Sequence, residues 1–164
     1  LLQKNIRYYE PIIRIIADPK NELWGIDIGK YNKANIEKII ATFKAISEYD
    51  EQNASVTLAT KIMLGVYGCV PAFDRFFTET FREISNGDCG FRRFNADALL
   101  EIKKFYESSS ELKEYIDSQS ELLFCQRFNG EETDIKYPVA KIIDMFGFQY
   151  SYKKKNESDC EELK

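Results

Sequence analysis

The chain of 164 residues contains no histidine. This absence excludes the Ser-His and Cys-His nucleophile pairs, the usual zinc sites with imidazole ligands, and the commonest general base near neutral pH. Any catalysis by this chain must therefore use carboxylates, lysine, tyrosine or cysteine.

Cysteine is scarce and long apolar runs are missing. The four cysteines, Cys69, Cys89, Cys125 and Cys160, form no C-x-x-C pair, so we expect reduced thiols and not a disulfide framework. No apolar stretch approaches the roughly 20 residues that cross a bilayer. The start of the chain is interrupted by charges and by Pro11, unlike a signal-peptide core. These features predict a cytoplasmic protein without a membrane partner.

Basic charge is also low. Lys and Arg total 23 against 27 Asp and Glu, which gives a net charge of −4 and a pI near 5.1. This balance argues against phosphate binding by the whole surface and leaves only local basic patches. The densest acidic group, Glu131, Glu132 and Asp134, is either a magnesium site or an exposed loop, and we expect the loop. No cofactor or metal is expected.

The chain is rich in apolar residues at helical spacing. Hydrophobic residues make up 44% and aromatic residues 14%, enough to build one core. The predicted architecture is all-α, a single-domain orthogonal bundle of about seven helices over residues 1–152, followed by a solvated charged tail at 153–164. No strand is predicted, and Trp24 is expected to fill the core.

Several helix ends are marked by the sequence. Asn32 and Asn95 are good N-caps, and a helix over 56–67 should end at Gly68. The S-x-x-E patterns at Ser108 and Ser118 predict one or two helix starts. The last helix should begin at Tyr137-Pro138 and end near Gly147.

The segment KIMLGVYGCVPAFD, residues 61–74, is the most informative stretch. An apolar helix ends at Gly68, a loop passes through Pro71, and Asp74 opens the next helix. Asp74 has two interpretations. It is an N-cap that accepts from the amides of Phe76 and Phe77, or it is a catalytic carboxylate that stabilises an oxocarbenium-like sugar and orients water.

This segment, extended to LATKIMLGVYGCVPAFDRFFTETFR, resembles the catalytic stretch of helix-hairpin-helix DNA glycosylases over about 25 residues. The resemblance implies an all-α fold with DNA as partner and Asp74 as the catalytic aspartate. Residues 53–56 lack the hairpin glycines of that family, and Thr57 occupies the position of the lysine in bifunctional members. The resemblance therefore implies at most a monofunctional glycosylase-like hydrolase.

The same motif, K-I-x-x-G-x-x-G-x-V-P-A-F-D, is similar to one in uncharacterised bacterial proteins, together with Y-P-x-x-K-I-I-D-M at 137–145. That resemblance names no activity, and it implies an association with phage defence.

The candidate site residues are Asp74 as catalytic carboxylate and Lys61, Arg92 and Arg93 as nucleic-acid-binding residues. Lysine on an apolar helix also reaches solvent without a ligand, and the two arginines have Asp88 and Asp97 as alternative ion-pair partners. Asp144 is expected to be partly buried and paired, with Lys141 as one possible partner.

Two functions remain open at this point. The first is a nucleic-acid-binding or glycosylase-like protein that uses Asp74. The second is a noncatalytic helical protein-interaction module of a bacterial defence or stress system. The structural observation that separates them is whether Asp74 faces a cleft large enough for a nucleoside, with Lys61, Arg92 or Arg93 on its rim.

Overall fold

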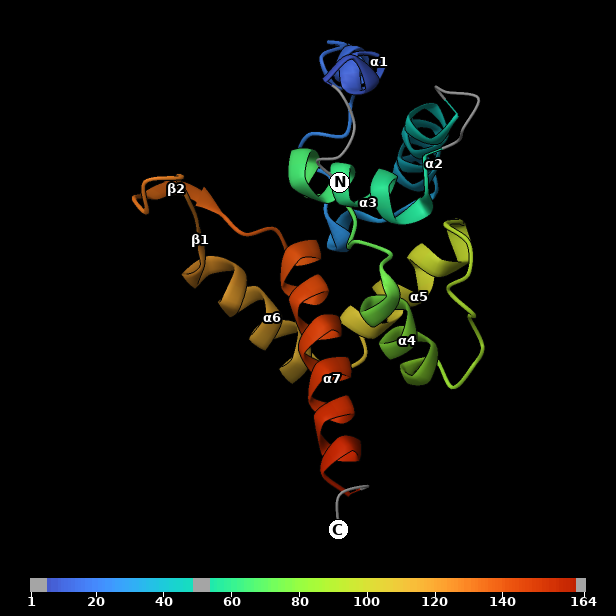
Figure 1. Ribbon diagram of the computed structural model, residues 1–164, viewed down its shortest axis with the longest axis vertical. Coiled ribbons are helices and arrows are strands. Elements are labelled where there is room, and N and C mark those ends of the chain that lie inside the picture. Colours follow the sequence, from blue (N-terminus) through green and yellow to red (C-terminus); the bar gives the residue numbers. More distant parts are fainter. Residues whose placement is uncertain (1–5, 49–53, 162–164) are drawn as a thin grey trace.

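The computed structural model describes residues 6–48 and 54–161 (Figure 1). Within these residues the chain is mostly helical, as predicted, with seven α-helices and one small sheet. The helices are α1 (Ile6–Ile16), α2 (Lys33–Ser47), α3 (Val56–Tyr67), α4 (Arg75–Ile84), α5 (Ala96–Tyr106), α6 (Ser110–Leu122) and α7 (Val139–Glu161). A short 3-10 helix η1 (Ile28–Lys30) and two strands, β1 (Phe124–Gln126) and β2 (Glu132–Lys136), complete the fold.

Most helices begin where a capping side chain predicts. The side chains of Asn32, Asp74 and Asn95 each accept a hydrogen bond from the backbone N–H three residues later. Helix α3 ends at Gly68, which has the positive φ of +64° that glycine adopts without strain. The prediction at α6 is wrong by one residue, because Ser109 is the cap, and the helix continues through Ser118.

Aromatic side chains form the centre of the core. Phe77 stacks on Phe81 with ring centroids 4.4 Å apart, and Phe73 lies 5.4 Å from Phe77. Phe91 and Phe94, from the segment between α4 and α5, meet Phe73 from another side. These contacts fix the loop before α4 against the core, and this loop carries Asp74.

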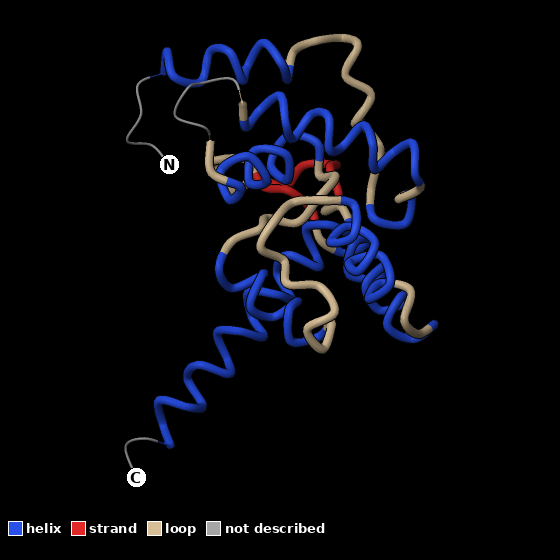
Figure 2. Tube along the Cα trace, turned by 90° about the vertical axis from the view of Figure 1, so that its right-hand side faces the viewer, coloured by secondary structure: helices blue, strands red, loops and turns tan. Residues whose placement is uncertain are grey.

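Helix α7 is much longer than predicted. Gly147 does not end it, because this glycine lets α7 approach α4: a Cβ atom built there would lie 2.9 Å from Phe77 Cδ2. Thr80 Oγ1 also donates to Gly147 O at 2.8 Å. The helix continues to Glu161, and its second half extends away from the other helices in both views (Figures 1 and 2). The sequence interpretation of Gly147 as a stop is therefore wrong.

The start of α7 is capped from a distant part of the chain. Asp27 accepts hydrogen bonds from Val139 N at 2.7 Å and Ala140 N at 3.0 Å, and also from Ile28 N at 2.7 Å. Burial raises the pKa of Asp27, and these three N–H donors oppose that rise. One carboxylate thus joins η1 to the first turn of α7.

The two strands are the part of the fold that the sequence did not predict. They form an antiparallel hairpin between α6 and α7, with Phe124 opposite Lys136 and Gln126 opposite Glu132. In Figure 1 the hairpin lies at one side of the molecule, away from α4 and α5. Glu131, Glu132 and Asp134 are exposed on it, as expected. No cluster of potential metal ligands occurs among the residues that the structure describes.

Candidate functional site

The loop between α3 and α4, Gly68 to Asp74, is buried along most of its length. Its first half is held by Tyr31, whose hydroxyl donates to Cys69 O at 2.6 Å. Gly68 packs against Pro138, and a Cβ atom built on Gly68 would lie 2.6 Å from Pro138 Cγ. The loop is therefore in contact with both η1 and the start of α7.

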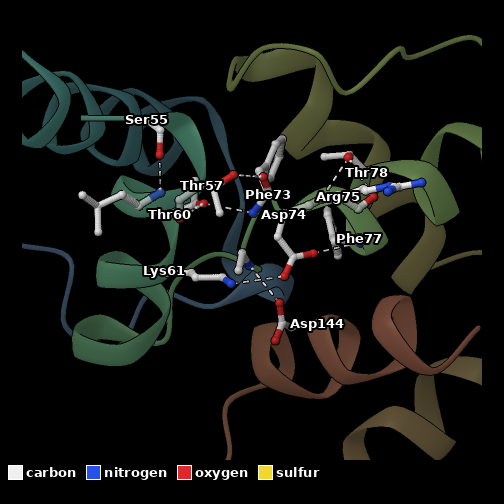
Figure 3. Close-up of polar contacts among 12 residues, drawn as sticks. Ser55, Thr57, Thr60, Lys61, Phe73, Asp74, Arg75, Phe77, Thr78 and Asp144 are labelled. Carbon is white, nitrogen blue, oxygen red and sulfur yellow. Dashed lines mark hydrogen bonds and ion pairs between the residues drawn. The ribbon is translucent and has the colours of Figure 1, made fainter. Parts of the chain in front are cut away.

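The second half of the loop is fixed by three side chains (Figure 3). Thr60 Oγ1 accepts from Phe73 N at 2.9 Å, and Thr57 Oγ1 donates to Phe73 O at 2.9 Å. From α7, Asp144 Oδ1 accepts from Ala72 N at 3.0 Å. Because the backbone just before Asp74 is bonded on both sides, the position of its side chain is well determined.

Asp74 uses its two carboxylate oxygens differently. Oδ1 accepts from Phe77 N at 3.1 Å, so Asp74 is the N-cap of α4. Oδ2 lies 3.4 Å from Nζ of Lys61, which is in the middle of α3. The two interpretations of Asp74 are thus compatible, since capping occupies one oxygen and leaves the other facing Lys61.

Asp74 and Lys61 line a cleft of about 1100 Å³. This volume is slightly above the range of roughly 300–1,000 Å³ that is usual for small-molecule sites. Helix α3, the loop, the hairpin and the first half of α7 all contribute to its walls. The lining residues include Trp24, Leu64, Tyr67, Ile135, Lys136, Pro138, Lys141, Asp144, Met145 and Phe148.

A second acid–lysine pair lies in the same cleft. Asp144 Oδ2 accepts from Lys141 Nζ at 3.0 Å, which confirms Lys141 as its partner. Figure 3 shows Lys61 reaching from α3, and Asp144 from α7, toward the segment that carries Asp74. The sequence indicated that Asp144 is partly buried, but it gave no sign that Asp144 and Asp74 share a cleft.

The cleft exposes large apolar side chains. Trp24 is 62% exposed, so the prediction that it fills the core is wrong. Its ring and that of Tyr67 form a T-shaped pair, with centroids 4.9 Å apart and an interplanar angle of 68°. Tyr67 is in turn held by Asn21 Nδ2, which donates to its hydroxyl at 2.6 Å. The indole of Trp24 therefore rests on a fixed support while most of its surface faces solvent.

Arg92 and Arg93 are not part of this cleft. Both are exposed in the segment between α4 and α5, while the flanking Phe91 and Phe94 are buried in the core. Among the described residues, neither arginine forms an ion pair with Asp88 or Asp97. The structure thus brings Lys61 to Asp74 and leaves the two arginines elsewhere.

Cys69 is close to the cleft but is chemically inert. Burial raises the pKa of its thiol to about 12, in the direction that its position at a helix end predicts. It is therefore not a nucleophile near neutral pH. Cys125, on β1, lines the cleft and is half-buried.

Comparisons with protein-family models, with curated proteins and with solved structures find no match to this chain. The resemblance to helix-hairpin-helix glycosylases therefore stays a prediction. Within the described ranges, no helix has both the length and the apolar character needed to cross a membrane.

Proposed function

We propose that this protein hydrolyses the N-glycosidic bond of a nucleoside unit in the cleft, with Asp74 as the catalytic carboxylate. The observation that carries the proposal is the position of Asp74 Oδ2, which faces a cleft of about 1100 Å³ beside Lys61. The hydrogen bond from Phe77 N to Oδ1 keeps the carboxylate in one orientation. A fixed carboxylate is what stabilisation of a developing positive charge requires.

The chemistry assigns one proton transfer to each member of the pair. As the bond between C1′ and the base nitrogen breaks, its electron pair leaves with the base, which takes a proton from the Lys61 ammonium. Water attacks C1′, which has oxocarbenium character, and gives its proton to Asp74 Oδ2. Proton transfer from Asp74 to Lys61 then restores both groups, across the 3.4 Å that separates them. The products are a free base and a sugar with a hydroxyl at C1′.

The composition of the chain supports this assignment. With no histidine available, a carboxylate–lysine pair is the acid–base arrangement that the cleft offers. The exposed indole of Trp24 supplies an apolar face on the same cleft, and aromatic faces bind bases by stacking.

The test is base release from a panel of nucleosides, nucleotides and oligonucleotides, measured by chromatography, with Asp74→Asn as the key variant. Asparagine caps helices as well as aspartate does, so the variant should fold normally. We expect base release to fall by at least about a hundredfold. Asp88→Asn, in the exposed loop after α4, is the matched control and should keep full activity. Equal release by wild type and Asp74→Asn would overturn the proposal, as would no release by wild type from any substrate.

The second candidate is a noncatalytic protein-interaction module. It is favoured by exposed aromatic side chains of α7 that lie outside the cleft, Tyr150 and Tyr152. In that case Tyr150→Ser combined with Tyr152→Ser should abolish the recovery of a specific partner, while Asp74→Asn should recover as much partner as wild type. The two candidates thus respond to different substitutions.

A further inference from the structure

We infer that the ligand of the cleft is an uncharged free nucleoside whose base stacks on Trp24, and not a nucleotide or a nucleic-acid strand. This inference deepens the proposed function, on which its catalytic part rests. Its binding part depends only on the charges and the shape of the cleft.

The ionic groups of the cleft are matched one to one. Lys61 faces Asp74, and Lys141 faces Asp144, both inside the cleft. The remaining lysine of the lining, Lys136, pairs with Glu121. A phosphate would have to displace a carboxylate from its lysine and then remain beside the displaced charge, which is unfavourable. An uncharged ligand leaves all three pairs intact.

The surroundings of the cleft also disfavour a polyanion. The hairpin that supplies Ile135 and Lys136 to the wall carries three exposed acids, Glu131, Glu132 and Asp134, against two bases, Arg127 and Lys136, and Lys136 is already paired with Glu121. The exposed Arg92 and Arg93 lie outside the cleft, and the whole chain has a net charge of −4. Binding of a nucleic-acid strand draws most of its affinity from cationic contacts to phosphates, and the rim of this cleft does not offer them.

The inner surface fits a nucleoside. Trp24 is 62% exposed and its indole packs in a T-shaped pair with Tyr67, so it offers an exposed aromatic surface on which a base can stack. Burial raises the pKa of the Tyr67 phenol, so this wall of the cleft adds no negative charge. The acid–lysine pairs offer acceptors and donors for sugar hydroxyls, which bind well to both.

Trp24 is the single tryptophan of the chain, so intrinsic fluorescence reports directly on the cleft. The probes are adenosine, guanosine, cytidine and uridine, their 5′-monophosphates, and a single-stranded decanucleotide. We expect at least one nucleoside to quench the fluorescence and to bind about tenfold more tightly than its monophosphate. Its affinity should be nearly the same at low and high salt. Tighter binding of the monophosphate or the decanucleotide, with steep salt dependence, would overturn the inference.

A charge change inside the cleft gives the sharpest control. Asp144→Asn keeps an oxygen for Ala72 N–H but leaves Lys141 without its carboxylate, so the cleft gains one positive charge. We expect the preference to shift about tenfold toward the monophosphate. Glu83→Gln, which frees Lys154 outside the cleft, should leave the preference unchanged. An unchanged preference in Asp144→Asn would contradict the charge-matching argument.

A second control concerns stacking. Trp24→Ala, measured by calorimetry, should lower nucleoside affinity by about tenfold, since the base loses the aromatic ring on which it stacks. Tyr115→Ala, on α6 and also 62% exposed, is the matched control and should bind normally. Equal affinities of the two variants would count against Trp24 as the stacking surface.

Failure of the inference is distinguishable from failure of the proposed function. Nucleoside binding without base release would support the inference and overturn the hydrolase. Base release from oligonucleotides that depends on Asp74, with no binding of any free nucleoside, would overturn the inference and support the hydrolase.

Discussion

Two loops flank α4, and they are built in opposite ways. The loop before α4, Gly68 to Asp74, is bonded to side chains that are 13 to 72 residues away in sequence. Among the described residues, the loop after α4, Ser85 to Asn95, forms side-chain hydrogen bonds only with residues at most 8 positions away, such as Ser85 to Cys89 O and Arg82 to Gly90 O. The first is buried and the second is largely exposed, apart from Ser85, Phe91 and Phe94.

The comparison shows where this fold keeps a side chain in a fixed position. Both loops carry charged residues that the sequence marked as candidates, Asp74 in the first and Arg92 and Arg93 in the second. Only the loop that several distant elements hold presents its charge to the cleft. The second loop is anchored in the core by the rings of Phe91 and Phe94, and its two arginines face solvent.

The largest expected difference concerns the two thiols, Cys69 in the first loop and Cys89 in the second. Burial raises the pKa of Cys69 to about 12, and its side chain has no exposed surface. A thiol with that pKa has about 10³-fold less thiolate at pH 8 than an ordinary cysteine. We expect iodoacetamide, followed by peptide mass spectrometry, to modify Cys89 at least about 10³-fold faster than Cys69. Equal rates would show that the first loop opens as readily as the second.

The glycines of the two loops give the next largest effect. Gly68 and Gly87 both have positive φ, +64° and +84°. A Cβ atom at Gly68 would lie 2.6 Å from Pro138 Cγ, whereas nothing lies within 4 Å of one at Gly87. We expect Gly87→Ala to cost about 1 kcal/mol from backbone strain alone, and Gly68→Ala about 3 kcal/mol because Pro138 must also move. Urea denaturation measures both, and equal costs would contradict the close packing against α7.

The smallest difference concerns the hydroxyl groups that hold each loop. Thr60→Val removes the acceptor of the buried Phe73 N–H and should cost about 2 kcal/mol. Ser85→Ala frees groups that lie close to solvent and should cost about 1 kcal/mol or less. Urea denaturation measures the loss of unfolding free energy in both variants, from the midpoints of curves that share the same m-value. A larger loss in Ser85→Ala would reverse the ranking of the loops.

The sequence predicted the helix starts well because capping is local. Asn32, Asp74 and Asn95 each bond to an amide three residues away, so a short window contains the whole interaction. The sequence also indicated both members of the Lys61–Asp74 pair as candidate site residues, since they are the first and last residues of the motif at 61–74.

The remaining features depend on distant partners. Gly147 marks a close approach to Phe77 and not a helix end, and nothing near it in sequence shows this. Asp144 reaches the loop before Asp74 across 72 residues. Trp24 lies on the wall of a cleft instead of in the core. That cleft is formed by five segments that together span most of the sequence. The strands of the hairpin, of 3 and 5 residues, are too short for a clear alternating pattern.

The cap that Asp27 provides for α7 has a consequence for the order of folding. Its bonds to Val139 and Ala140 span 112 and 113 residues, so forming them closes a loop of most of the chain. Such closure carries a large entropic cost and comes after contacts between neighbouring helices, such as α2 with α3. Because the first turns of α7 form one side of the cleft, we expect the cleft to form late in folding. A chain that has its helices but lacks the Asp27 bonds should therefore bind no small molecule there.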